Sequence, residues 1–162
     1  MGELQLKENE YRAYIKEHVA NIHAAFLKYG KELCSLIFET PGALYTRVIK
    51  HDDSKYCNIE FDAYRQYFYP CSDEEPNEEE FNNAWKHHYR NNDHHPEYWI
   101  DDDGTIKDMP PICVAEMLLD WEAMSMKFNG STYEYYLKEK DVKPFSENTK
   151  KLLAELITVF KE

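Results

Sequence analysis

The chain has 162 residues, of which 43% are hydrophobic and 15% aromatic, and its formal net charge is −12. This length and composition fit one folded domain with a substantial core and exclude an intrinsically disordered chain. The acidic balance, without a stripe of lysine and arginine, argues against binding to long nucleic acids, which needs cations opposite the phosphates. A small phosphorylated substrate stays compatible, because a bound divalent cation would dominate the local field.

The same sequence predicts neither membrane insertion nor secretion. It contains no apolar run long enough to span a bilayer, and its first residues lack the apolar segment of a signal peptide. Four cysteines, at positions 34, 57, 71 and 113, show no paired spacing. We therefore expect free thiols in a cytoplasmic protein.

Apolar residues recur every three to four positions along most of the chain, which indicates helices. Residues 8–29 carry the first such stripe, and Gly30 is expected to end or bend it before a second helix at 31–38. A short apolar run at 43–50 leads directly into His51. Further helices are predicted at 59–69, 78–89, 112–128, 131–139 and 146–160, with loops at 70–77 and 91–108.

The predicted architecture is an all-α bundle of about six to eight helices. We expect one domain over residues 1–162, with a core at about 11–136 and a C-terminal helix at 146–161. No alternating strand pattern and no internal repeat is present in the sequence.

The His51-Asp52 doublet is the first candidate for metal chemistry. An imidazole nitrogen beside a carboxylate oxygen offers good ligands for borderline and hard divalent metals. Lys55 lies one turn later, where it could contact a substrate phosphate or neutralise a carboxylate. Asp53 is expected to be an exposed carboxylate, and the doublet alone could also arise by chance.

A third ligand is predicted on the first helix. His18 is the preferred candidate, with a hydrogen-bonded interior histidine as the alternative. His23 is the reserve, because five residues correspond to a rotation of about 140° around a helix, so both rings cannot point at one site.

Two histidine pairs form the next candidate block. On a helix His87 and His88 diverge by about 100°, so one is expected to face the site and the other its rim. His94 and His95 fall in the predicted loop, where they could ligate a second metal, bind substrate or donate a proton. Arg90 is a candidate phosphate contact, although most such charges face water.

Asp120 closes the set from within a strongly apolar helix. A carboxylate there is costly to bury unless it is paired or binds a metal. Glu116, four residues earlier, shares its helix face and is a candidate for the layer behind the ligands. The alternative is a solvated acidic face.

These residues together resemble the HD-domain superfamily of metal-dependent phosphohydrolases. The pattern of that superfamily is an early helical histidine, a His-Asp doublet and a late helical aspartate, here His18, His51-Asp52 and Asp120. The extended doublet His51-Asp52-Asp53-Ser54-Lys55 is similar to His-Asp-x-Gly-Lys, with Ser54 where glycine is usual. Over about residues 11–136 the chain resembles more closely a bacterial and phage family of unknown function.

The resemblance implies hydrolysis of a nucleotide or another small phosphate ester by a metal-activated water. It implies metal ligation by His18, His51, Asp52, His87, His88 and Asp120, catalytic roles for Lys55, His94 and Glu116, and substrate contacts from Lys55, Arg90 and His95.

One or two divalent ions are expected, from Mn, Fe, Co, Ni, Zn or Mg, and a homodimer stays open. The alternatives are an HD-type di-iron oxygenase and a non-catalytic module that binds a nucleotide or a protein around a structural metal.

Overall fold

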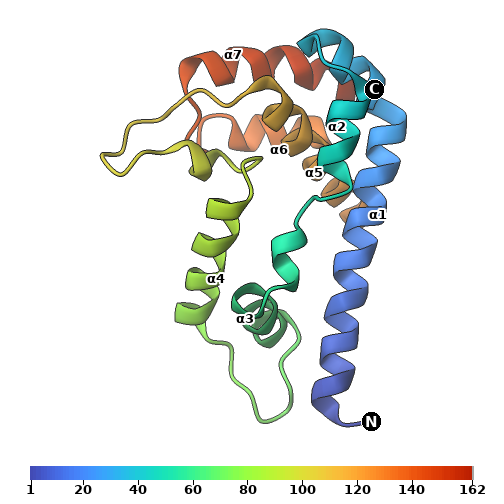
Figure 1. Ribbon diagram of the computed structural model, residues 1–162, viewed down its shortest axis with the longest axis vertical. Helices are drawn as coiled ribbons and strands as arrows, with labels where there is room; N and C mark the ends of the chain where they lie inside the picture. The colour runs from blue at the N-terminus through green and yellow to red at the C-terminus, as the bar shows by residue number, and fades with distance from the viewer. Residues whose placement is uncertain (162) are drawn as a thin grey trace. The chain divides into compact units, whose positions relative to one another are not determined.

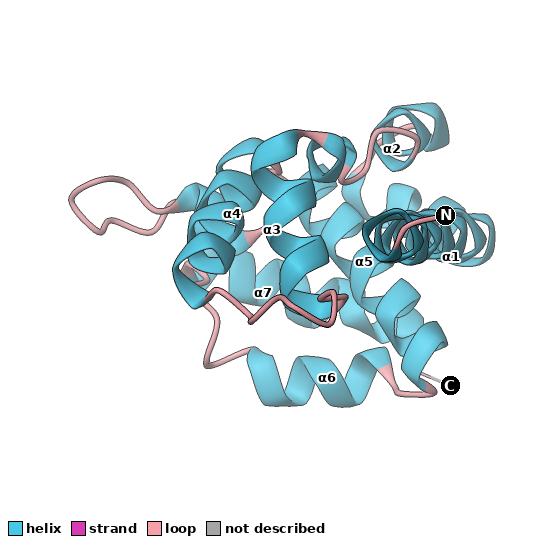
Figure 2. Ribbon diagram, turned by 90° about the horizontal axis from the view of Figure 1, so that it is seen from below, coloured by secondary structure: helices cyan, strands magenta, loops and turns pink. Residues whose placement is uncertain are grey.

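The computed structural model describes residues 1–161, which contain seven α-helices and three short 3-10 helices (Figure 1). Figure 2 shows that residues 1–161 form helices and loops, without a drawn strand. An isolated antiparallel β-bridge joins Ile100 and Ile106. The predicted all-α class is therefore confirmed. The helices are α1 (Glu3–Ile37), α2 (Pro41–Val48), α3 (Asn58–Phe68), α4 (Glu78–Asn91), α5 (Pro111–Phe128), α6 (Thr132–Glu139) and α7 (Glu147–Leu156).

Most helix ends follow local side-chain chemistry. The side chains of Thr40, Ser131 and Ser146 accept hydrogen bonds from the first turns of α2, α6 and α7. Asn129 ends α5 in the left-handed conformation, with φ 51°. The predicted loop at 91–108 contains the 3-10 helix η2 (Pro96–Trp99).

The prediction that Gly30 ends the first helix before a second one at 31–38 is wrong, because α1 continues through it to Ile37. A Cβ at Gly30 would lie 2.5 Å from Cδ2 of Phe26, so the glycine leaves room for this ring. Burial of Leu33 and Cys34 beyond it stabilises the continuous helix and outweighs the low helix propensity of glycine, about 1 kcal/mol. The helix ends instead at Phe38, whose φ is 58°.

The chain divides into two compact units. Unit 1 comprises Met1–Glu17 and Asp52–Asn92, and unit 2 comprises His18–His51 and the described residues from Asp93 onward. The His51-Asp52 doublet therefore contributes one residue to each unit.

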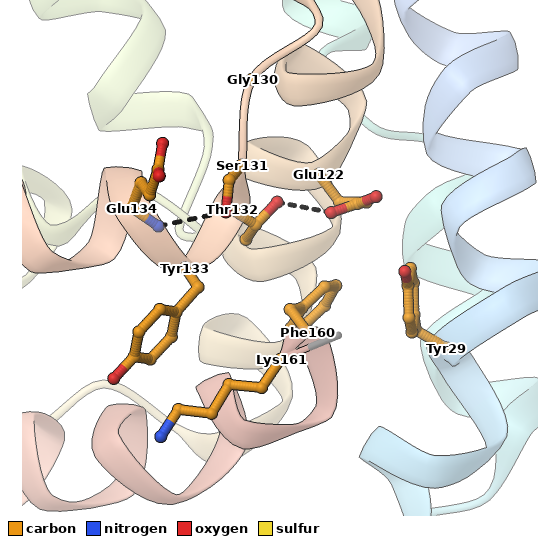
Figure 3. Close-up of a pocket in the computed structure, with 9 residues that line it drawn as sticks. All are labelled: Tyr29, Glu122, Gly130, Ser131, Thr132, Tyr133, Glu134, Phe160 and Lys161. Carbon is orange, nitrogen blue, oxygen red and sulfur yellow. Dashed lines mark hydrogen bonds between the residues drawn. The ribbon is translucent and has the colours of Figure 1, made fainter.

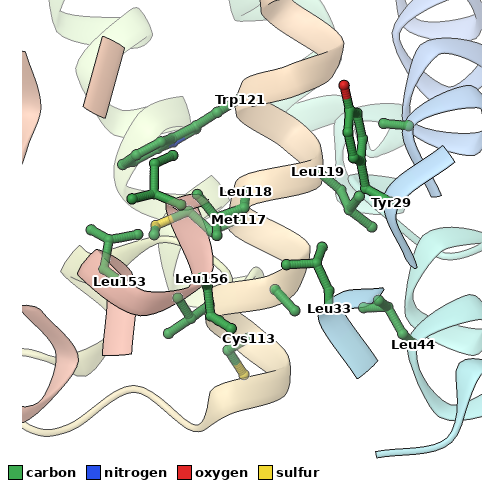
Figure 4. Close-up of a cluster of buried hydrophobic side chains, with 14 of the residues drawn as sticks. Tyr29, Leu33, Leu44, Cys113, Met117, Leu118, Leu119, Trp121, Leu153 and Leu156 are labelled. Atoms are coloured by element: carbon green, nitrogen blue, oxygen red, sulfur yellow. The ribbon is translucent and has the colours of Figure 1, made fainter. Parts of the chain in front are cut away.

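Unit 2 has the larger core, built around α5. Nine residues of α5 are buried, so this helix is apolar on most of its circumference, as expected for a central helix. Met117, Leu118 and Leu119 pack with residues such as Leu33 and Leu156 (Figure 4). This packing fixes the helix that carries Glu116 and Asp120.

Unit 1 has a smaller aromatic core on α1, α3 and α4. Phe61, Tyr64 and Ala84 are buried there. Ile59 and Phe68 of α3 lie outside this core, since each residue is 58% exposed. α3 instead buries Glu60, which determines the chemistry of this unit.

Among residues 1–161, each helix is too short or too polar to cross a bilayer.

Candidate metal centre

α5 presents two acidic side chains to the interior of unit 2. Glu116 is buried and Asp120 is 14% exposed at its side chain. Their spacing of four residues places both on one helix face, as the sequence predicts. Both carboxylates contact His94, with Nδ1 3.3 Å from Glu116 Oε1 and Nε2 3.5 Å from Asp120 Oδ2.

Three histidines from three segments converge on Asp120. His18 lies on α1, His51 follows α2 and His94 lies in the loop after α4. The Nε2 atoms lie 3.1 Å (His18), 3.9 Å (His51) and 3.5 Å (His94) from a carboxylate oxygen of Asp120. With Glu116, these residues are called the Glu116 cluster.

Glu116 fixes the orientation of two of the rings. His51 Nδ1 lies 2.8 Å and His94 Nδ1 lies 3.3 Å from Glu116 Oε1. An ionised carboxylate can only accept, so the hydrogen must be on each Nδ1. In a neutral ring the lone pair is then on Nε2, the atom that faces Asp120. This tautomer is the one that binds metals through Nε2.

Arg47 supplies the balancing charge. Its Nε donates to Glu116 Oε2 at 2.5 Å, and its Nη2 donates to Asp93. Burial raises the pKa of Glu116, but hydrogen bonds from His51 and His94 outweigh it, so the pKa is held well below its usual range. Glu116 is therefore an anion at neutral pH.

The loop that carries His94 is tied down on both sides. Asp93 accepts from Arg47 through its side chain and from Trp99 Nε1 through its carbonyl, at 2.7 Å for the latter. The buried Pro96 opens η2 directly after the two histidines. His94 is thus as buried as a helical ligand although it lies in a loop.

Unit 1 contains a second buried carboxylate between two histidines. Glu60 Oε1 lies 2.6 Å from His87 Nδ1, and Glu60 Oε2 lies 2.8 Å from His88 Nδ1. His88 is buried, and its Nε2 lies 3.3 Å from Asp52 Oδ1. These four residues are called the Glu60 cluster.

Asp52 is held by charges of its own unit. Lys55 Nζ lies 2.8 Å from Asp52 Oδ2, so the lysine neutralises a carboxylate, one of its two predicted roles. Burial lowers the pKa of His88, but hydrogen bonds to Asp52 and Glu60 outweigh it and raise the pKa to about 9. Asp52 itself adopts the left-handed conformation, with φ 58°.

Within unit 2 the structure brings part of the predicted site together. His18, not His23, meets Asp120, because His23 is half-buried and makes an edge contact with Tyr45 instead. His95 is half-buried against the ring of His94, and Arg90 is exposed on α4.

Sequence reasoning missed Glu60 and Arg47. Glu60 lies on the same face of α3 as the buried residues Phe61 and Tyr64. This position in the helix was the sequence feature that could have indicated its burial. Arg47 lies on α2 beside the apolar residues Leu44 and Val48. A cation among apolar residues requires an acidic partner, and this was the clue that the sequence offered.

A hollow of about 550 Å³ lies elsewhere in unit 2, beside Tyr29, Thr132 and Phe160 (Figure 3). The residues that line it include none of the predicted site residues. The candidate site is the Glu116 cluster, which contains two groups that could hold a metal ion: His18, His51 and Asp120, and His51, His94 and Glu116.

Comparison with known proteins gives one match. The sequence profile of a family of unknown function, DUF5662, matches residues 7–159. No curated protein matches the chain. No solved structure matches it either.

Proposed function

Because the chain belongs to the family of unknown function DUF5662, we propose its function from its own residues: a metal-dependent phosphohydrolase. We propose that it acts on a nucleotide or another small phosphate ester, and that the Glu116 cluster holds the metal.

The observation that carries the proposal is the convergence of three imidazole Nε2 atoms on Asp120. Atoms that share one tetrahedral ion at 2.0–2.2 Å lie roughly 3.3–3.6 Å apart. The distance from Nε2 to Asp120 is 3.1 Å for His18, measured to Oδ1, and 3.9 Å for His51 and 3.5 Å for His94, both measured to Oδ2, and these distances bracket this value. A ring lone pair and the Asp120 carboxylate repel each other when they face one another. A cation between them is attracted to both groups.

The resemblance to the HD superfamily supports the same residues. Its pattern of an early histidine, a His-Asp doublet and a late aspartate selects His18, His51 and Asp120, which meet in unit 2. The pattern also makes Asp52 a ligand, and this stays a prediction. Ser54 in place of the usual glycine does not alter a ligand.

The chemistry requires a divalent ion, which lowers the pKa of a bound water and polarises a phosphoryl oxygen. Glu116 holds the Nδ1 hydrogens of His51 and His94, so both rings present Nε2. Arg47 donates a hydrogen bond to Glu116 and fixes the position of its carboxylate. Asp120 supplies the negative charge that retains a dication among neutral rings.

Three imidazoles and one carboxylate suit Mn, Fe, Co, Ni or Zn better than Mg, which prefers oxygen ligands. The phosphate contacts that the resemblance implies at Lys55, Arg90 and His95 stay predictions. With a net charge of −12, the protein attracts a phosphate ester only where cations gather, which is a further reason to place substrate at the metal.

The test is elemental analysis of the purified full chain, followed by a panel of phosphate esters and nucleotides with added Mn, Co, Ni, Zn or Mg. We expect Asp120→Asn to lose about one equivalent of metal and the hydrolytic activity. His23→Gln is the control and should keep both, because His23 lies on the same helix outside the cluster. Full metal content in Asp120→Asn would overturn the proposal.

The doublet has its own matched pair of variants. Asp52→Ala should lose metal if the HD resemblance holds, whereas Asp53→Asn should not, because Asp53 is exposed. Iron-dependent consumption of dioxygen without ester hydrolysis would reject the phosphohydrolase in favour of an oxygenase.

A further inference from the structure

We propose a separate metal site in unit 1, formed by Cys57, Glu60 and His87 and called the Cys57 site. It would take a borderline ion such as Zn²⁺ or Co²⁺ through a thiolate. It is independent of the phosphohydrolase proposal, since all three residues belong to unit 1 and none to the Glu116 cluster.

The backbone brings the three donors together. Cys57 is the residue before α3, and Glu60 is the third residue of that helix. A spacing of three places both side chains on one side of the first turn. α4 packs against α3 and brings in His87, whose Nδ1 lies 2.6 Å from Glu60 Oε1. One donor atom from each residue lies within 4.8 Å of the other two.

The donor types select the metal. Cysteine sulfur, histidine nitrogen and a carboxylate oxygen are the ligands that Zn²⁺ takes in proteins. The sulfur disfavours Mg²⁺ and Ca²⁺, which prefer oxygen. Three protein ligands also leave a fourth tetrahedral position for water or another small ligand.

Burial separates Cys57 from the other thiols. The four cysteines are free, but Cys34, Cys71 and Cys113 are buried and Cys57 is half-buried. Burial raises the pKa of Cys113 to about 12, which keeps that thiol protonated. Cys57 and His87 are accessible to an ion from solvent, whereas Glu60 anchors the site from inside.

Binding opens the 2.6 Å contact between His87 Nδ1 and Glu60 Oε1, because two ligands of one ion lie farther apart. Glu60 Oε2 can keep its hydrogen bond from His88 while Oε1 turns to the ion. Binding releases the thiol proton of Cys57 to solvent, and the ion then carries the positive charge beside Glu60. The first turn of α3 also favours negative ligands through the helix dipole.

The experiment is a Co²⁺ titration of the full chain, followed by optical spectroscopy. Thiolate ligation gives a near-ultraviolet charge-transfer band that imidazole and carboxylate ligands do not give. We expect this band in the native chain, its loss in Cys57→Ser and at least about tenfold weaker binding in His87→Gln. Cys71→Ser is the matched control and should keep the band, and circular dichroism confirms folding of each variant.

Asp120→Asn distinguishes the two proposals. If the Cys57 site exists, the band persists in Asp120→Asn even if the Glu116 cluster no longer binds metal. Absence of the band from the native chain at any Co²⁺ excess, or its survival in Cys57→Ser, would overturn the inference while leaving the Glu116 cluster untouched.

Discussion

The two units contain similar arrangements with different charges. In each, a buried glutamate lies between two histidine Nδ1 atoms: Glu116 between His51 and His94, and Glu60 between His87 and His88. In the Glu116 cluster an arginine, Arg47, donates to the carboxylate that orients two of the rings.

The Glu60 cluster is balanced differently. Its positive charge comes from a ring of the cluster itself, because the pKa of His88 is raised to about 9. A protonated ring cannot ligate a metal through the nitrogens that carry its hydrogens. The comparison teaches that the source of the balancing charge, not the presence of histidines, decides which rings can bind an ion.

The largest expected effect is on stability, from removal of the arginine. Arg47→Met should destabilise the chain by roughly 3 kcal/mol, since it leaves Glu116 buried without its permanent countercharge. Urea unfolding at pH 7 measures it. A loss below about 1 kcal/mol would show that the histidines alone balance Glu116 and would remove the difference between the clusters.

The second effect is on metal affinity. Glu116→Gln should weaken binding at the Glu116 cluster about 10–100-fold, because the rings lose the carboxylate that sets their tautomer. Glu60→Gln is the matched control and should leave that affinity within about threefold. Calorimetric titration in a Cys57→Ser background confines binding to the cluster. Equal losses in both variants would contradict the account.

A smaller effect is expected from the lysine of unit 1. Lys55→Met should cost about 1 kcal/mol, because Asp52 keeps His88 as a charged partner after Lys55 is gone. The same urea assay compares it with Arg47→Met. A cost as large as that of Arg47→Met would mean that Lys55, rather than His88, balances Asp52.

The smallest effect concerns a carboxylate without histidines, which serves as a baseline. Glu74 accepts hydrogen bonds from Arg65 and from the backbone N–H of Cys71, and these lower its pKa to about 2. Because the folded pKa is depressed, its stabilisation is present above about pH 4.5 and is lost as the pH falls through 2.

The difference in unfolding free energy between the native chain and Glu74→Gln should therefore be roughly 1 kcal/mol at pH 7 and shrink towards zero at pH 2. Urea unfolding at a series of pH values measures it. A difference that is constant over this range would assign the effect of Glu74 to packing.

Much of the fold followed from apolar periodicity, because it is a local property of the sequence. The segment ending at His51 and the helix carrying Asp120 were predicted close to their observed bounds. Gly30 was misread because its role depends on the ring of Phe26, and a glycine without its tertiary contact resembles a helix end.

The candidate site also contains features that local sequence patterns predict and features that depend on tertiary contacts. The meeting of His18 with Asp120, and the common face of Glu116 and Asp120, were accessible from motif and spacing. Glu60 was not, because a count of apolar positions ignores a buried acid on the same face. The position of His94 was also inaccessible, since loops have no period and its place depends on Arg47 and Trp99.

The central claim is that His18, His51 and His94 bind one ion together with Asp120. X-ray absorption fine structure at the cobalt edge, on Cys57→Ser protein loaded with a single equivalent of Co²⁺, tests it most directly. The account predicts multiple scattering from about three imidazole rings and a first shell of nitrogen and oxygen at roughly 2.0–2.2 Å. A shell of oxygen alone, without imidazole scattering, would contradict it.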